Sequence, residues 1–271
     1  MKTLKQDGRI ARKFSELKAR GEKALITFIT AGDPDLAGTK KIISTLEGSG
    51  ADIIELGIPF SDPMADGPTI QASSERAVKN GVRLRDVLAL VKEVREASEI
   101  PIVLFGYYNP IFQYGLEKFA KDARKAGADG VLVVDLPAEE ADELKAELDK
   151  NGISLIFLLT PTSTEERIKL TAGKASGFIY FVSVTGVTGA RRNVSAKVSG
   201  YVKKVRRHID IPIGVGFGIS TPGQVKEVCG YSDAVIVGSA IVNIIGKNGG
   251  SGSLLKEVGG FVAGLKKGTL P

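Results

Sequence analysis

The chain has 271 residues, of which 43% are hydrophobic and 25% are charged, and its formal net charge is +6. This composition is ordinary for a soluble globular protein and leaves room for one large α/β domain or two small ones. No apolar run approaches the roughly 20 residues of a membrane span. No basic block is interleaved with aromatic residues, so nucleic acid binding is not expected.

The chain contains one cysteine, Cys229, and one histidine, His208. A disulfide within the chain is therefore impossible, which favours a reducing compartment and predicts a cytoplasmic protein. A zinc site built from His and Cys needs several such ligands, so the sequence predicts no metal site. Residues 1–23 are basic, contain acidic residues and lack an apolar centre. That pattern indicates an amphipathic surface helix and not a signal peptide.

Short, nearly continuous apolar segments alternate with longer amphipathic segments along the rest of the chain. Such apolar segments are typical of strands that are buried on both faces of a parallel sheet. The predicted strands are residues 24–32, 51–59, 100–107, 129–137, 153–160, 177–184, 211–218 and 233–241. Helical periodicity predicts helices at residues 37–50, 84–98, 116–127, 138–152, 164–174, 195–208, 221–230 and 252–268. The Gly- and Ser-rich segment 246–253 is expected to be a mobile loop before the last helix.

A glycine stop followed by a strand recurs in "SGADIIELG", "AGADGVLVVD" and "NGISLIFLL". A βα unit repeated about every thirty residues, eight times over, predicts a single-domain (β/α)8 TIM barrel with an extra N-terminal helix. A doubly wound open sheet is the alternative, but it rarely needs eight parallel strands. No linker is visible, so we expect one domain over residues 1–271, with the extra helix in 1–23 and the barrel in 24–271.

The loops that follow barrel strands carry function, and the second, "ELGIPFSDPMADG", is one of the longest. Glu55 ends a buried strand, where an isolated carboxylate is costly and its pKa should be raised, which suits proton transfer near neutral pH. Asp62 and Asp66 follow in a stretch too rich in Pro and Gly for helix or strand. Capping of the next helix is an alternative role for either aspartate.

The last three strand ends offer glycines, small hydroxyls and backbone N–H groups in place of large side chains. Glycine allows a ligand to approach the backbone, and barrels often bind phosphate at the loops after strands seven and eight. The pattern predicts a phosphate site at Gly189, Gly218, Gly238 and Ser239. The alternative is that these glycines only make tight turns.

No lysine falls at a strand end, so a Schiff-base aldolase is not expected. His208 precedes the seventh strand, on the opposite face of the barrel, and Cys229 is expected to pack in a helix. The titratable residues expected at the catalytic face are Glu55, Asp62, Asp66, Tyr107, Tyr108, Asp135 and Tyr180. These residues predict carboxylate acid–base chemistry on a phosphorylated substrate, and carbon–carbon cleavage would require that the substrate supplies its own electron sink.

The segments "ELGIPFSDPMADGPTIQ", "GYYNPIFQYG", "SVTGVTGAR", "GFGIS" and "VGSAIV" together resemble the tryptophan synthase alpha chain. The resemblance extends from "FITAGDPD" to the last helix. It implies a cofactor-free lyase of tryptophan biosynthesis that cleaves indole-3-glycerol phosphate to indole and D-glyceraldehyde 3-phosphate. Protonation of indole C3 would make the electron sink.

The resemblance also implies roles for individual residues. Glu55 would be the general acid and base, and Asp66 would remain ionised and accept a hydrogen bond from the indole N–H. Phe28, Phe105 and Leu132 would form the slot for the indole ring, although packing in the barrel core explains Phe105 equally well. The other implied ligand contacts are Tyr107, Tyr180 and Thr188 for the substrate, and Gly189, Phe217, Gly218, Gly238 and Ser239 for its phosphate.

The resemblance further implies a partner, a pyridoxal-phosphate-dependent beta chain in an αββα complex. Residues 59–71 and 108–112 would face that partner, and Asp62 would be structural or part of the interface. Two alternatives stay open, namely a free-standing lyase with the same catalytic residues and a non-catalytic barrel that only binds a phosphorylated ligand. An indole-glycerol-phosphate synthase is not expected, because its ring closure depends on strand-end lysines and this sequence has none at those positions.

Overall fold

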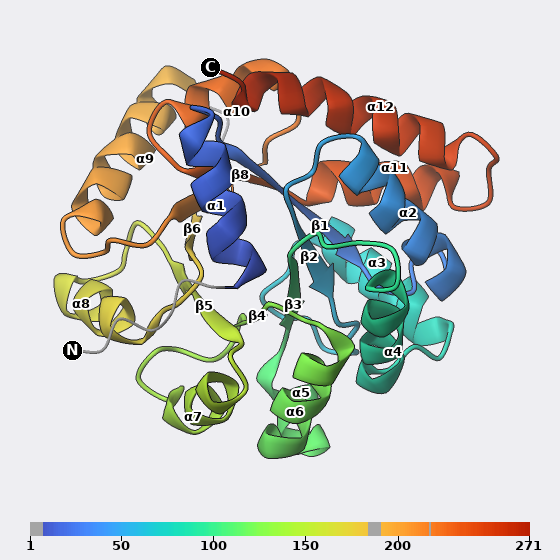
Figure 1. Ribbon diagram of the computed structural model, residues 1–271. Coiled ribbons are helices and arrows are strands. Elements are labelled where there is room, and N and C mark those ends of the chain that lie inside the picture. The colour runs from blue at the N-terminus through green and yellow to red at the C-terminus, as the bar shows by residue number, and fades with distance from the viewer. Residues whose placement is uncertain (1–7, 184–190, 217) are drawn as a thin grey trace.

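The computed structural model describes residues 8–183, 191–216 and 218–271. Within these ranges, eight parallel strands are hydrogen-bonded in sequence order and form a closed barrel, with helices in a ring around it (Figure 1). The strands are β1 (Ala24–Thr30), β2 (Ile53–Gly57), β3 (Ile102–Gly106), β4 (Gly130–Val133), β5 (Ser154–Leu159), β6 (Ile179–Val182), β7 (Ile213–Gly216) and β8 (Ala234–Val237). The predicted (β/α)8 barrel is confirmed, with an extra helix before β1.

The helices lie mostly where the sequence predicts them. They are α1 (Arg9–Ala19), α2 (Leu36–Gly48), α3 (Pro68–Lys79), α4 (Leu84–Val94), α5 (Tyr108–Tyr114), α6 (Leu116–Ala126), α7 (Asp142–Lys150), α8 (Glu165–Lys174), α9 (Arg191–Arg206), α10 (Pro222–Cys229), α11 (Ser239–Asn248) and α12 (Leu254–Lys266), followed by the 3-10 turn η1 (Lys267–Thr269). None of the helices within the described ranges is long and apolar enough to cross a membrane.

Three helices, α3, α5 and α11, were not predicted. The helix α3 begins at Pro68, inside the stretch expected to be neither helix nor strand, because proline is well tolerated at the first position of a helix. The helix α11 begins at Ser239 and ends at Asn248. The predicted strand 233–241 is therefore too long, and the predicted loop 246–253 is wrong for residues 246–248.

Inward-facing apolar side chains fill the barrel below the site, and α1 closes its amino end. The inner cluster includes Ile26 and Leu132 from the strands and Phe178 just before β6, together with Ile10 and Leu17 from α1. Figure 1 shows α1 across this end of the barrel. The amino end is thus packed shut, which leaves the carboxyl ends of the strands as the open face.

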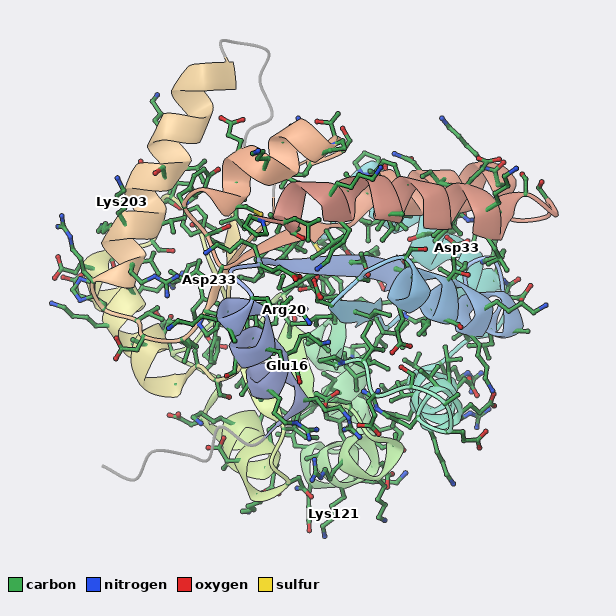
Figure 2. The ribbon with its side chains drawn as sticks, turned by 45° about the horizontal axis from the view of Figure 1, so that its top comes forward. Glu16, Arg20, Asp33, Lys121, Lys203 and Asp233 are labelled. Carbon is green, nitrogen blue, oxygen red and sulfur yellow. The ribbon has the colours of Figure 1, made fainter. Side chains whose placement is uncertain are left out.

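Carboxylates at the starts of alternate strands hold the neighbouring strands at the amino end. Their side chains accept hydrogen bonds from strand N–H groups in the pairs Leu25–Asp52, Ile102–Asp129 and Ile213–Asp233. Each carboxylate also contacts a cation, respectively Lys266, Arg95 and Arg206. Figure 2 labels Asp233 at this end and Arg20 just after α1, while Lys121 and Lys203 lie on outer helices. These acids, of which Asp52 and Asp129 are buried, stabilise the fold and are remote from the open face.

Candidate active site

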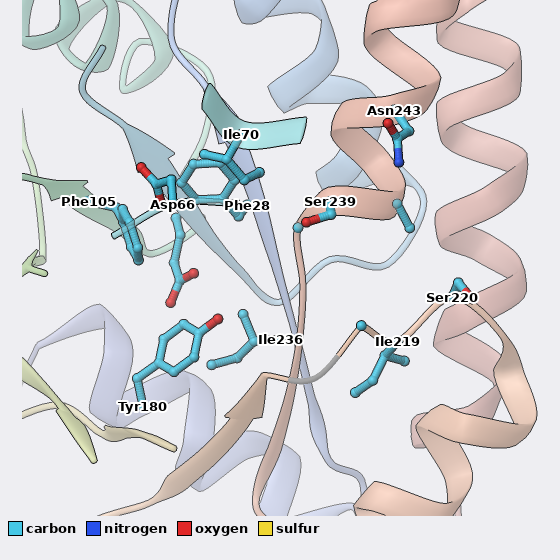
Figure 3. A pocket seen from close by; sticks show the side chains of 14 residues that line it. Phe28, Asp66, Ile70, Phe105, Tyr180, Ile219, Ser220, Ile236, Ser239 and Asn243 are labelled. Atoms are coloured by element: carbon cyan, nitrogen blue, oxygen red, sulfur yellow. The ribbon is translucent and has the colours of Figure 1, made fainter. Parts of the chain in front are cut away.

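A cavity of about 330 Å³ opens at the carboxyl end of the barrel (Figure 3). Figure 3 shows Phe28, Asp66, Ile70 and Phe105 on one side of it and Ser220, Ser239 and Asn243 on the other. Its lining residues are Phe28, Glu55, Asp66, Ile70, Phe105, Tyr180, Gly218, Ile219, Ser220, Ile236, Gly238, Ser239, Ala240 and Asn243. The structure thus brings together both predicted catalytic acids, two predicted aromatic residues, Tyr180 and three predicted phosphate contacts.

Glu55 lies on β2 at the base of this cavity and is completely buried. Neither of its carboxyl oxygens has a hydrogen-bond partner among the residues that the structure describes. Burial raises the pKa of Glu55 to about 8, because the charged form loses its hydration without gaining a partner. The group is therefore mostly protonated at neutral pH, and it can both give a proton and take one back.

Tyr180 approaches the same region from β6 and is half-buried. Burial raises its pKa well above the ordinary value, and the charges of Glu55 and Asp66 add to the effect, so its phenol stays protonated. Gly216 on the neighbouring strand β7 makes room for the ring, because a Cβ atom there would lie 2.4 Å from the Tyr180 hydroxyl oxygen. The glycine at the end of β7 is thus required by the position of Tyr180.

Asp66 lies just before α3 and enters the cavity from the second loop. The Tyr107 hydroxyl donates a 3.0 Å hydrogen bond to Asp66 Oδ2 and accepts another of 3.0 Å from the N–H of Ala65. Burial raises the pKa of Asp66, and the hydrogen bond from Tyr107 opposes that rise because it favours the ionised form. The N-cap of α3 is Gly67, with no side-chain cap in the described part of the chain, so Asp66 does not cap this helix.

Aromatic residues form the apolar wall beside the two acids. Phe28 pairs in register with Glu55, and its ring meets that of Phe105 edge to face, with centroids 5.0 Å apart. Leu132 is the register partner of Phe105 and is fully buried in the inner cluster. It lies in the barrel core and does not line the described cavity. Tyr107 lies behind Asp66 and contacts the loop that carries it.

The far end of the cavity offers small groups and a helix N-terminus. Gly218 has a φ of +38°, in the left-handed region that favours glycine. Gly238 packs closely on Phe28, since a Cβ atom at residue 238 would lie 3.3 Å from Phe28 Cβ. The helix α11 begins at Ser239, and no side chain from the described ranges caps it. Such an N-terminus attracts anions through its partial positive charge. The predicted contacts Thr188, Gly189 and Phe217 lie outside the described residues.

Sequence reasoning missed part of the lining. Ile70 and Asn243 belong to helices that were not predicted, although Asn243 follows Ser239 by four residues, the spacing that places two side chains on one helix face. The other missed lining residues are Ile219, Ser220, Ile236 and Ala240. Ile219 and Ala240 each adjoin a predicted phosphate contact, which was the available signal.

Other titratable residues have local roles. Asp135 accepts a 2.7 Å hydrogen bond from the N–H of Tyr108 at the start of α5. Burial raises the pKa of the Cys229 thiol to about 11, and the residue packs against the outer core as predicted. His208 lies 3.7 Å from Glu165, away from the cavity. Among the described residues, no three His, Cys, Asp or Glu side chains are grouped so that they could hold a metal ion.

A TIM barrel with a buried glutamate that has no partner in the described ranges, a second carboxylate and an anion-attracting helix end in one cavity defines an enzyme of the acid–base class. Comparison with known proteins identifies the family. The family model described as "Tryptophan synthase alpha chain" matches residues 14–267. The chain belongs to the tryptophan synthase alpha chain family, and it is a lyase.

Individual relatives agree along their full lengths. The tryptophan synthase alpha chain of Geotalea uraniireducens (strain Rf4) is 59% identical over 260 residues, which cover 96% of this chain and 97% of the relative. The alpha chain of Thermoanaerobacter sp. (strain X514) is 51% identical over 259 residues, 96% of this chain and 98% of the relative. The crystal structure of tryptophan synthase subunit alpha from Legionella pneumophila str. Paris has a TM-score of 0.91 at 39% identity and covers 97% of this chain and 98% of that one.

Proposed function

We propose that Glu55 and Asp66 perform the reaction of this family in the cavity described above. That reaction is the cleavage of indole-3-glycerol phosphate to indole and D-glyceraldehyde 3-phosphate in tryptophan biosynthesis. The observation that carries the proposal is the burial of Glu55, which has no hydrogen-bond partner in the described chain and a pKa of about 8, in one cavity with Asp66.

Glu55 moves the protons. Its protonated carboxyl group gives a proton to indole C3, which converts the ring into an indolenine with an electron-poor C=N bond. The resulting carboxylate takes the proton of the glycerol hydroxyl next to the bond to be broken. As that hydroxyl becomes an aldehyde, the electrons of the carbon–carbon bond return to the ring and restore indole. One group can serve both steps because its pKa lies close to neutral pH.

Asp66 stabilises the positive charge that develops on the ring nitrogen, by accepting a hydrogen bond from the indole N–H. This role requires the ionised carboxylate, which the hydrogen bond from Tyr107 favours. Phe28 and Phe105 supply an apolar wall for the indole ring. Tyr180 remains a neutral donor beside Glu55.

The phosphate would bind at the other end of the cavity, on Gly218, Gly238 and Ser239. The support is the uncapped N-terminus of α11 together with the glycine in left-handed conformation at residue 218. Thr188, Gly189 and Phe217 remain predicted contacts from outside the described ranges. The substrate would then extend from the acids at β2 to the helix end after β8.

The family implies a beta chain as partner, and we propose that it docks on the open face of the barrel in an αββα complex. Two strongly exposed apolar side chains favour this face as the docking surface. Met64 in the second loop is 92% exposed, and Phe112 on α5 is 54% exposed. Both lie in segments predicted to meet the partner. The pyridoxal phosphate would belong to that partner, and a cytoplasmic location stays a prediction.

The test is indole release from indole-3-glycerol phosphate by the purified chain, with and without a beta chain. Weak release that the beta chain increases supports both the reaction and the partnership. Rapid release by the chain alone supports a free-standing lyase with the same catalytic residues. The absence of release under both conditions would contradict the proposed reaction and leave a barrel that only binds a phosphorylated ligand.

A further inference from the structure

Asn243 lies at the mouth of the cavity, on the side opposite Asp66 (Figure 3). It follows Ser239 by four residues on α11, so the two side chains project from the same face of the helix. Both line the cavity together with Ser220. Asn243 therefore faces the region in which the phosphate would bind.

The side chain of Asn243 also contacts α3, the helix that begins two residues after Asp66. Thr69 Oγ1 donates a hydrogen bond of 3.4 Å to Asn243 Oδ1. Thr69 is the second residue of α3 and follows Asp66 by three residues. Because the carbonyl oxygen of the amide accepts from Thr69, the amide Nδ2 keeps both of its N–H donors for other partners.

The two helices are also held together one to two turns further on. A Cβ atom at residue 246 of α11 would lie 3.0 Å from a guanidinium nitrogen of Arg76 on α3. Arg76 is fixed in turn by two hydrogen bonds to buried Asp33, of 2.8 and 2.7 Å. The ion pair of Arg76 with Asp33 thus fixes the far part of α3, and the Thr69–Asn243 hydrogen bond joins its cavity end to α11.

The charge of the cavity lining favours a neutral hydrogen-bond donor at the phosphate end. Its described lining contains two carboxylates, Glu55 and Asp66, but neither lysine nor arginine. A phosphate dianion in this cavity must therefore be held by backbone N–H groups, hydroxyls and amides. A neutral amide binds phosphate without neutralising the two acids that the reaction uses.

We infer that Asn243 is a substrate-binding residue: its amide N–H donates to the phosphate while its carbonyl oxygen accepts from Thr69. Through this bridge, phosphate bound at α11 fixes the end of α3 that carries Asp66 against the indole ring. The inference rests on the proposed function, because it takes the phosphate to bind at the N-terminus of α11.

The first test is Asn243→Asp, which keeps the acceptor for Thr69 but replaces the donor with a negative charge. The KM for indole-3-glycerol phosphate should rise about tenfold or more. Binding of glyceraldehyde 3-phosphate should weaken similarly, whereas binding of indole, which has no phosphate, should not change. Asn243→Ala, which adds no charge, should raise KM less. Lys247→Gln is the matched control, because it makes the same change in net charge on α11 outside the cavity lining.

The second test is Thr69→Val, which keeps the shape of the side chain but removes its hydroxyl. It should lower kcat severalfold with little change in KM, and the effects of Thr69→Val and Asn243→Ala should not multiply in the double variant. An unchanged KM in Asn243→Asp, in a chain whose wild type cleaves the substrate, would overturn this inference alone. Failure of the wild type to cleave it would overturn the proposed function instead.

Discussion

The hydroxyl of Tyr107 makes two hydrogen bonds of 3.0 Å, one to the Asp66 carboxylate and one from the N–H of Ala65. Tyr107 follows β3 and is 5% exposed, whereas Asp66 belongs to the loop after β2. A residue at the end of β3 thus holds the acid and its backbone at once. Tyr107 positions Asp66 and favours its ionised form.

Tyr107→Phe should lower kcat/KM for indole-3-glycerol phosphate about tenfold, since it removes a hydrogen bond to a charged group. The hydrogen bond lowers the pKa of Asp66, so its loss should raise that pKa. Because the proposed role of Asp66 requires the ionised form, the acid limb of the pH profile of kcat/KM should move to higher pH. Tyr114→Phe is the control, because that hydroxyl donates to Asp122, outside the cavity. Superimposable acid limbs would contradict the role of Tyr107.

Glu55→Gln should stabilise the folded protein at alkaline pH. The pKa of Glu55 is raised from 4.5 to about 8, so between these values the folded chain holds a proton that the unfolded chain releases. Wild-type stability should therefore fall as pH rises from about 4.5 to 8 through this group, and the amide avoids that loss. The expected gain is roughly 2–4 kcal/mol at pH 8.5 and near zero at pH 4.5, measured by urea unfolding. An equal gain at both pH values would refute the buried titration.

Gly216→Ala should disturb Tyr180 directly, because the new methyl group would lie 2.4 Å from its hydroxyl oxygen. Such overpacking should reduce the free energy of unfolding by about 1–3 kcal/mol and lower kcat. The matched control is Gly200→Ala on α9, where a Cβ atom would meet no other atom within 4 Å. That change should be neutral or slightly stabilising, since alanine favours a helix. Equal thermal unfolding midpoints for both variants would exclude the crowding at Tyr180.

Arg76→Ala should destabilise the protein by about 2–3 kcal/mol, because it leaves the carboxylate of Asp33, 2% exposed, without its cation. The estimate is at the low end for a buried pair because the Arg76 side chain is 39% exposed. Lys79→Ala on the same helix removes an exposed pair with Glu75 and should change stability little. Chemical unfolding of the two variants provides the comparison, and similar losses in both would contradict the importance of the buried pair.

The barrel was predictable because each strand is apolar on both faces and because the pattern of a glycine stop followed by a strand repeats. The same pattern contains Asp52 and Asp129, whose carboxylates accept hydrogen bonds from N–H groups near the starts of the preceding strands. That role requires the neighbouring strand in register, so periodicity along the chain does not show it. Glu55, in contrast, could be identified from its own strand, because a lone acid in an apolar strand is a local anomaly.

The unpredicted parts depend on contacts between distant segments. The sequence of α3 begins with Pro68 in a loop rich in Pro and Gly, and α11 continues directly from a strand, so neither has a clear helical start. Asn243 and Ile70 were missed with these helices. Tyr107 was predicted as a substrate contact, but its hydrogen bonds to Asp66 and Ala65 arise from 41- and 42-residue separations in the chain.

The most direct test compares indole release by the wild type and by Glu55→Gln across pH, over indole-3-glycerol phosphate concentrations up to saturation and with a beta chain present. Glu140→Gln, an exposed change on the same face, is the control for loss of a carboxylate. The proposed role of Glu55 as proton carrier predicts at least about a hundredfold loss of kcat in Glu55→Gln. It also predicts a wild-type kcat/KM that declines above about pH 8 as Glu55 loses its proton. A Glu55→Gln variant that folds and retains the wild-type kcat would contradict it.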